Sequence, residues 1–155
     1  MVVNAEIWKK FQKEIFIGNL IKIFGLTKKD KPHTSFYPDL VFHHSQFDSD
    51  KQEIICEIKT IQGINDKKNV KLNHDLRKLA AYMTDETLLY HPFKIGAFIL
   101  VGGALSEIKN RYQDYELINQ KKNDIYCLSY NIKETDENCY IADVECMSLN
   151  EVLQL

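Results

Sequence analysis

Hydrophobic residues dominate two short segments, residues 37–42 and 53–61, which are separated by a polar stretch. Pro38 suits the beginning of a strand, and the β-branched residues of the second segment favour extended structure. The stretch between them is rich in residues that are common in turns, namely Ser45, Asp48, Ser49 and Asp50. The pattern therefore predicts a β-hairpin with a loose loop.

The second of these strands carries charged residues within an otherwise apolar pattern. Because successive side chains alternate, one face holds Ile54, Cys56 and Ile58, and the other holds Ile55, Glu57, Lys59 and Ile61. A strand that is apolar on both sides is usually central and covered on both faces. Glu57 and Lys59 should then be paired or have a task, since burying a lone charge is costly. If Asp39 lies opposite on the neighbouring strand, two carboxylates and one ammonium group converge.

Apolar residues at helical spacing predict three helices. These cover residues 4–17, 73–90 and 104–121, and Asn4 and Asn73 are the candidate N-caps of the first two. The pattern leaves open whether the first helix continues to residue 24 or gives way to a short strand over residues 20–24. The polar segment 62–72 is expected to be a loop.

Three further strands complete the predicted order of elements. Residues 93–101 are almost wholly apolar and predict a buried central strand, which Gly102 and Gly103 end. Segments 124–132 and 139–147 predict a C-terminal hairpin, and the tail adds a short helix. This order indicates one α/β domain over residues 1–155, with helices packed around a mixed sheet.

Composition narrows the class of protein only slightly. The chain has 45% hydrophobic and 27% charged residues, and its net charge of −2 argues mildly against nonspecific coating of nucleic acid. Four cysteines without a C-x-x-C pair predict no zinc site, and Cys56 and Cys127 fit small buried hydrophobes. Polar first residues and the lack of a long apolar run predict a cytoplasmic protein without a signal peptide or membrane span.

The charged group proposed for the hairpin has a chemical logic. Two carboxylates, from Asp39 and Glu57, are hard oxygen ligands suited to Mg²⁺, and the backbone carbonyl of Ile58 could add a third ligand. Such an ion lowers the pKa of a bound water and neutralises charge that develops on a phosphate. Lys59 could orient that water or donate to the phosphate.

These residues carry a resemblance to a known family. Pro38-Asp39, followed by Glu57-Ile58-Lys59, resembles the motif of the PD-(D/E)xK nuclease superfamily, which includes restriction endonucleases. The resemblance implies a restriction-endonuclease-like three-layer sandwich, here with an extra C-terminal β-hairpin. It also implies a nuclease dependent on Mg²⁺ or Mn²⁺ that acts on nucleic acid, with DNA as the expected substrate. Asp39 and Glu57 would be the metal ligands and Lys59 the catalytic lysine.

Further residues are candidates for the same site. In many superfamily members the first helix brings an acidic residue towards the metal, and Glu14 or Glu6 could do so here. A lysine-rich stretch after the second strand could meet substrate phosphates through Lys67, Lys68 and Lys71. The following helix resembles one that presents a Lys or Gln and a Tyr to the site, which points to Lys78 and Tyr82. For each of these residues, ordinary solvated charge or helix packing is an equally good explanation.

Two other interpretations compete with a nuclease site. Glu57 and Lys59 could form an exposed pair on a surface hairpin, which contributes little energetically. Alternatively, the fold could be a catalytically silent module that binds a protein or nucleic acid within a larger assembly. Many superfamily members act as dimers, so a homodimer is compatible with the chain, but the helix faces single out no interface.

Overall fold

A computed structural model of the chain describes residues 2–4, 38–43, 52–65, 69–84, 92–134 and 140–155. Its centre is a six-stranded mixed sheet whose spatial order follows the chain, β1-β2-β3-β4-β5-β6. The strands are β1 (Val2–Asn4), β2 (Leu40–His43), β3 (Gln52–Thr60), β4 (Ile95–Val101), β5 (Ile125–Glu134) and β6 (Tyr140–Ser148). Strands β3, β4 and β5 are parallel, and the remaining neighbours are antiparallel. The fold is therefore α/β, as the sequence predicts.

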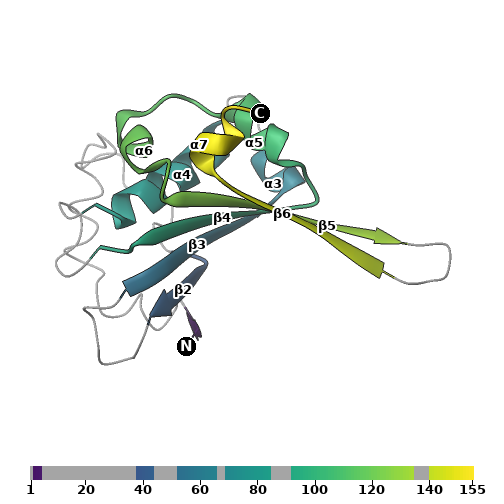
Figure 1. Cartoon of the computed structure of the whole chain (residues 1–155), viewed down its shortest axis with the longest axis horizontal. Coiled ribbons are helices and arrows are strands. Elements are labelled where there is room, and N and C mark those ends of the chain that lie inside the picture. Colours follow the sequence, from purple (N-terminus) through teal and green to yellow (C-terminus); the bar gives the residue numbers. More distant parts are fainter. Residues whose placement is uncertain (1, 5–37, 44–51, 66–68, 85–91, 135–139) are drawn as a thin grey trace, which may run out of the picture.

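Helices cover one face of this sheet (Figure 1). They are α3 (Ile61–Ile64), α4 (Val70–Tyr82), α5 (Leu105–Arg111), α6 (Glu116–Lys121) and α7 (Leu149–Val152). Helix α4 lies in the connection between the parallel strands β3 and β4, and α5 and α6 lie between β4 and β5. Within the described parts of the chain, every helix is too short or too polar to span a bilayer.

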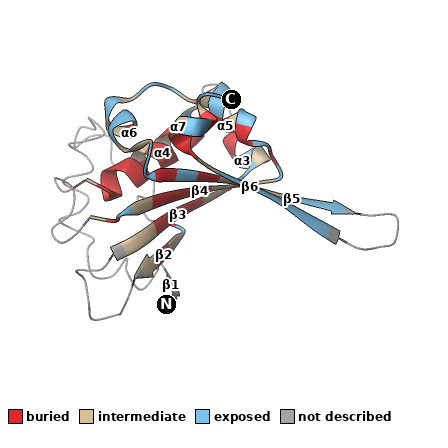
Figure 2. Cartoon of the chain, viewed as in Figure 1, coloured by how far each residue is buried: buried red, intermediate tan, exposed pale blue. Residues whose placement is uncertain are grey.

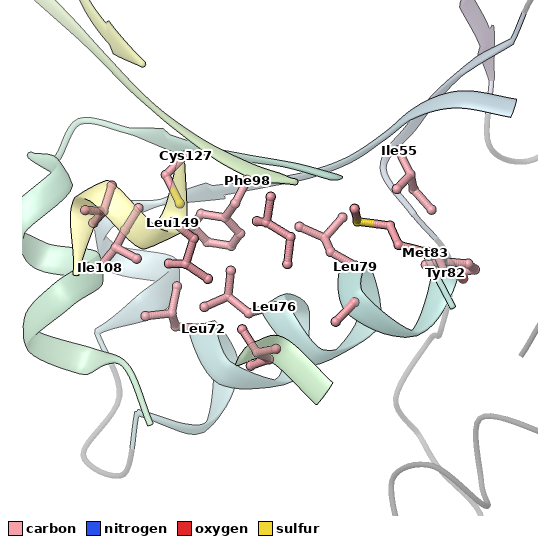
Figure 3. Close-up of a cluster of buried hydrophobic side chains, with 14 of the residues drawn as sticks. Ile55, Leu72, Leu76, Leu79, Tyr82, Met83, Phe98, Ile108, Cys127 and Leu149 are labelled. Atoms are coloured by element: carbon pink, nitrogen blue, oxygen red, sulfur yellow. The ribbon is translucent and has the colours of Figure 1, made fainter. Parts of the chain in front are cut away.

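The hydrophobic core fills the space between α4 and the sheet (Figure 3). Leu72, Leu76 and Leu79 recur at helical spacing on α4, and they face Phe98 of β4 and Ile55 of β3. All five side chains are fully buried. Figure 2 shows α4 and the central strands coloured largely as buried. This packing fixes α4 over β3, which decides where the charged residues of both elements lie.

The predicted hairpin is present. Strand β2 pairs antiparallel with β3, with Leu40 opposite Cys56, and the register shifts between Phe42 and His43. Strand β4 and the C-terminal pair β5–β6 also form as predicted, and the tail folds into the short helix α7. Ser148 and Glu151 close a capping box at its start, in which each side chain bonds the other residue's backbone amide.

Asn4 is the last residue of strand β1, which pairs with β2 at the edge of the sheet, and the helix expected after it lies outside the described residues. Another predicted helix is divided in two. The predicted helix 104–121 is two helices, separated where Gln113 donates its backbone amide to the side chain of Asn73.

The loop expected over residues 62–72 is partly helical. Thr60 accepts a hydrogen bond from the amide of Gly63 and so starts α3, and the segment then contributes the first turn of α4. The predicted N-cap Asn73 lies inside α4, which begins after Asn69. The expected helix or strand over residues 5–24 lies outside the described residues.

The last two strands extend beyond the rest of the sheet. β5 and β6 pair along their whole length, from Tyr126 opposite Ser148 to Glu134 opposite Tyr140. Strand β4 pairs with β5 only as far as Tyr130. The outer part of the β5–β6 pair therefore projects from the body as a two-stranded ribbon (Figure 1).

Candidate active site

Asp39 lies immediately before β2 begins, beside the part of β3 that continues past the end of the β2–β3 pairing. Its backbone amide donates to the carbonyl of Cys56 at 3.0 Å, which continues the pairing of the two strands by one residue. Its carboxylate Oδ2 then accepts a hydrogen bond from the backbone amide of Ile58 at 2.7 Å. The carboxylate thus takes the place of the backbone carbonyl that would accept from Ile58 if the β2–β3 pairing continued. This bond holds the side chain beside β3, and 42% of the side chain remains exposed.

Glu57 projects from β3 towards α4 and is fully buried. Its Oε1 lies 2.8 Å from Nζ of Lys78, which is itself 4% exposed. Among the described residues no donor is aligned for a hydrogen bond to either Oε1 or Oε2, so the contact with Lys78 is an ion pair. The interpretation of Glu57 as half of an exposed surface pair is therefore wrong, because this carboxylate is enclosed by its own fold.

Lys59 connects the acidic residues of the group. Its Nζ lies 3.9 Å from Asp39 Oδ2, 3.9 Å from Glu57 Oε2 and 3.4 Å from Asp75 Oδ2. The Asp39 and Glu57 oxygens must then lie within twice 3.9 Å of each other. The expected convergence of residues 39, 57 and 59 is present, and it is centred on the lysine.

Asp75 completes the group from α4, and the sequence did not single it out for this role. It is buried, and its Oδ1 lies 3.4 Å from Lys78 Nζ and 3.8 Å from His74 Nδ1. Lys78 follows Asp75 by three residues, a spacing that brings both side chains to one side of a helix. This spacing, on the helix that follows the charged strand, was the available signal.

Burial and charge act on these groups in opposite directions. The pKa of Glu57 is raised to about 8. Desolvation by burial is the largest cause and outweighs the lowering effect of Lys78, and the nearby carboxylates of Asp75 and Asp39 contribute to the same increase. For Lys59, desolvation lowers the pKa, but the carboxylates of Asp75, Asp39 and Glu57 produce a net increase. For Asp75, burial raises the pKa, but a hydrogen bond from His74 and the two lysines produce a net decrease. Among Glu57, Lys59 and Asp75, Glu57 is therefore the residue whose pKa is shifted in favour of its neutral form.

The remaining predicted site residues are distributed as follows. Lys78 contacts Glu57 from α4, and its role with substrate stays a prediction. Tyr82 is fully buried one turn further along α4, where its ring meets the edge of Phe93 at a centroid distance of 6.4 Å. Lys71 is exposed in the first turn of α4. Lys67, Lys68, Glu6 and Glu14 lie outside the described residues.

Comparisons of the chain with protein-family models, with curated proteins and with solved structures found no match. What the group can do must therefore be argued from its own chemistry. It combines three carboxylates and two lysines at the edge of a buried strand, and it is reached from solvent through Asp39 and the 29% exposed side chain of Lys59.

The donor set fits a hard divalent cation in part. Glu57 Oε2 is a buried carboxylate oxygen without an aligned donor, and Asp39 Oδ2 is a second carboxylate oxygen in the same group. Against this, no three His, Cys, Asp or Glu side chains in the described residues are arranged to hold a metal ion. The lysines occupy the space between the carboxylates, so an ion would have to displace an ammonium group.

Proposed function

We propose that the chain is a metal-dependent nuclease of the PD-(D/E)xK type, with Mg²⁺ or Mn²⁺ as cofactor and DNA as the expected substrate. The observation that carries the proposal is the position of Lys59 Nζ, 3.9 Å from both Asp39 Oδ2 and Glu57 Oε2. The sequence motif predicts this meeting of three side chains. Two separated segments would seldom bring them together by chance on a buried strand.

The arrangement of elements supports the finer fold assignment within the same proposal. An antiparallel β2–β3 pair is followed by α4 and then by β4 parallel to β3, which agrees with the core that the family resemblance implies. The described helices form one layer on the sheet. A restriction-endonuclease-like three-layer sandwich also requires helical cover on the other face, for which the predicted helix 4–17 is the candidate.

In this proposal each residue has a distinct role. Asp39 and Glu57 would hold the cation, which when bound neutralises charge on the scissile phosphate and lowers the pKa of its water. Lys59 carries a positive charge, is partly exposed, and donates to the phosphate or orients the attacking water. Lys78 is a positioning residue, because it contacts Glu57 from α4 and holds that side chain towards the site.

Cleavage assays test this function directly. The chain would be incubated with plasmid DNA, linear DNA and RNA in the presence of Mg²⁺ or Mn²⁺, together with Asp39→Asn and Lys59→Met. Both variants should lose cleavage and keep their circular dichroism spectra. Lys133→Met is the matched control, since Lys133 lies on the exposed ribbon and pairs there with Asp143. Full cleavage by Asp39→Asn and Lys59→Met would refute the assignment of the site.

A second candidate is a catalytically silent module that binds a partner through the same fold. Two observations favour it: Lys78 already contacts Glu57 at 2.8 Å, and Asp39 already accepts a backbone hydrogen bond. Calorimetric titration with Mn²⁺ separates the candidates. A nuclease should bind the ion and lose that binding in Asp39→Asn, whereas a silent module should bind no ion and cut none of the three substrates.

A further inference from the structure

One face of the projecting β5–β6 ribbon carries no charged residue along most of its length. The pairs Leu128–Cys146, Tyr130–Val144 and Ile132–Ala142 lie opposite one another, and alternation along both strands puts all six side chains on one face. We call these six residues the ribbon strip. Tyr126 and Ser148 continue it towards the body of the sheet.

The opposite face of the ribbon is different in character. Nearer the body it contributes to the core through Ile125 and Cys127, which are fully buried on the helix side of the sheet. Further out it carries polar and charged residues beside one isoleucine, namely Ser129, Asn131, Lys133, Ile141, Asp143 and Glu145. Lys133 and Asp143 pair across the strands at 2.9 Å. The six residues of the ribbon strip are therefore uncharged and point away from the helices, and the pair Glu134–Tyr140 continues the same face at the outer end.

The ribbon strip is exposed where the ribbon leaves the sheet. Ile132 is 60% exposed and Val144 is 54% exposed, and Ala142 and Cys146 are exposed beside them. Figure 2 shows this outer part of β5 and β6 as exposed. A two-stranded hairpin by itself is marginally stable in water, and contiguous exposed apolar residues on a folded protein mark interaction sites. The ribbon strip is therefore a candidate surface for contact with a partner.

Charge decides which partner fits. Nucleic acid is bound chiefly through cations, and the ribbon strip has none, while the other face carries two carboxylates, Asp143 and Glu145, against one lysine, Lys133. A second ribbon strip is the simplest complement, because neither surface buries a charge. When two strips meet face to face, the acidic faces of both copies point outwards into solvent and do not oppose each other.

The available area suits a dissociable dimer. Half-exposed aromatic and branched side chains each leave on the order of 100 Å² in water, so one strip with Tyr126 offers roughly 500 Å². Two copies together then bury about 1,000 Å², which is at the low end for specific interfaces.

We propose that the ribbon strip is a homodimer interface, in which two copies of the chain pack their β5–β6 ribbons face to face about a two-fold axis. In such an isologous contact the same residues meet from both sides, which a strip without charges tolerates. The interface is separate from the group around Glu57 and holds whether or not that group cuts nucleic acid.

Sedimentation equilibrium of the full chain over a range of concentrations tests the proposal. The wild type should show a reversible monomer–dimer equilibrium. Val144→Lys places a charge in the middle of the ribbon strip and should be monomeric throughout. Glu145→Lys changes the next residue, on the other face, and should dimerise like the wild type. Circular dichroism checks that both variants fold, and Ile132→Lys replaces Val144→Lys if that variant does not.

Three results would overturn the interface. A wild type that stays monomeric at every concentration has no such dimer. A dimer that survives in Val144→Lys and Ile132→Lys forms through another surface. A monomeric wild type that co-sediments with phosphatidylcholine vesicles, and loses this in Val144→Lys, uses the ribbon strip on a lipid surface.

Discussion

The two partners of the buried pair Glu57–Lys78 should respond very differently to mutation. Glu57→Gln keeps the shape of the side chain and a carbonyl that accepts from Lys78 Nζ, 2.8 Å away. Asp75, 3.4 Å from the same nitrogen, still compensates the charge of Lys78. Among the described residues, Lys78→Met instead leaves the buried Glu57 with Lys59 as its remaining cation, 3.9 Å from Oε2. Lys78→Met should therefore be the more destabilising of the two changes.

The pKa of Glu57 sets how this cost depends on pH. The folded-state pKa is raised from 4.5 to about 8, so folding favours the protonated form and the wild type loses stability as pH rises through that interval. The slope is about 1.4 kcal/mol per pH unit for one such group. Above pH 8 Glu57 is ionised in both the folded and the unfolded protein, so its contribution to the free energy of unfolding no longer changes with pH.

Each variant changes that profile in its own way. Glu57→Gln removes the titrating group, so the loss of stability between pH 4.5 and 8 should be smaller than in the wild type. Lys78→Met removes the ion pair with Glu57 and leaves a buried carboxylate without its partner, a cost of about 3–5 kcal/mol when the carboxylate is ionised. It also raises the pKa of Glu57 further. The cost of Lys78→Met should then grow above pH 8 by about 1.4 kcal/mol per unit.

Urea denaturation followed by circular dichroism measures these profiles. The free energy of unfolding would be determined at pH 5, 7 and 9 for the wild type, both single variants and the double variant Glu57→Gln/Lys78→Met. The double variant should cost less than the sum of the single changes, because it leaves no buried carboxylate unpaired. Equal costs for the two single variants, or a wild-type profile that Glu57→Gln leaves unchanged, would refute the reasoning.

Three other changes probe the scaffold around this group. Gly96→Val should lower stability by about 1–3 kcal/mol in urea denaturation, since even a Cβ at this position would lie 2.8 Å from the sulfur of Met83, and an unchanged midpoint would contradict this overlap. Ser148→Ala removes the capping box with Glu151 and should cost about 1 kcal/mol, measured in the same way, with no change expected in the spectrum of the rest of the chain. Asn73→Ala removes the hydrogen bonds that the Asn73 side chain donates to the carbonyls of Asn69 and Arg111, and the one it accepts from the amide of Gln113. Hydrogen exchange of the Gln113 amide should therefore accelerate, and unchanged protection of that amide would contradict this prediction.

Much of the sheet could be predicted because its strands carry strong local signals. Alternation and β-branched residues locate β3, and the apolar run of β4 indicates a strand covered on both faces. The convergence of residues 39, 57 and 59 follows from the pairing of β2 with β3, which the hairpin pattern implies.

Other features depend on contacts between distant segments and could not be predicted. The break between α5 and α6 arises where Asn73, some forty residues earlier, takes the amide of Gln113. Asp75 enters the charged group only because the core packs α4 directly over β3. The contact between Asn73 and Gln113 leaves no periodic trace in the sequence, and the spacing of Asp75 and Lys78 shows only that these two side chains share one side of a helix.

The hydrogen bond from the Ile58 amide to Asp39 ties this aspartate to folding as well as to chemistry. A descendant of this chain that had lost all activity would still retain an acceptor at position 39, because a strand amide would otherwise be left without a partner. Conservation of this aspartate among descendants would therefore be weak evidence that they are catalytically active. Lys59 bonds no backbone group in the described part of the chain, so its conservation would be stronger evidence of an active site than conservation of Asp39.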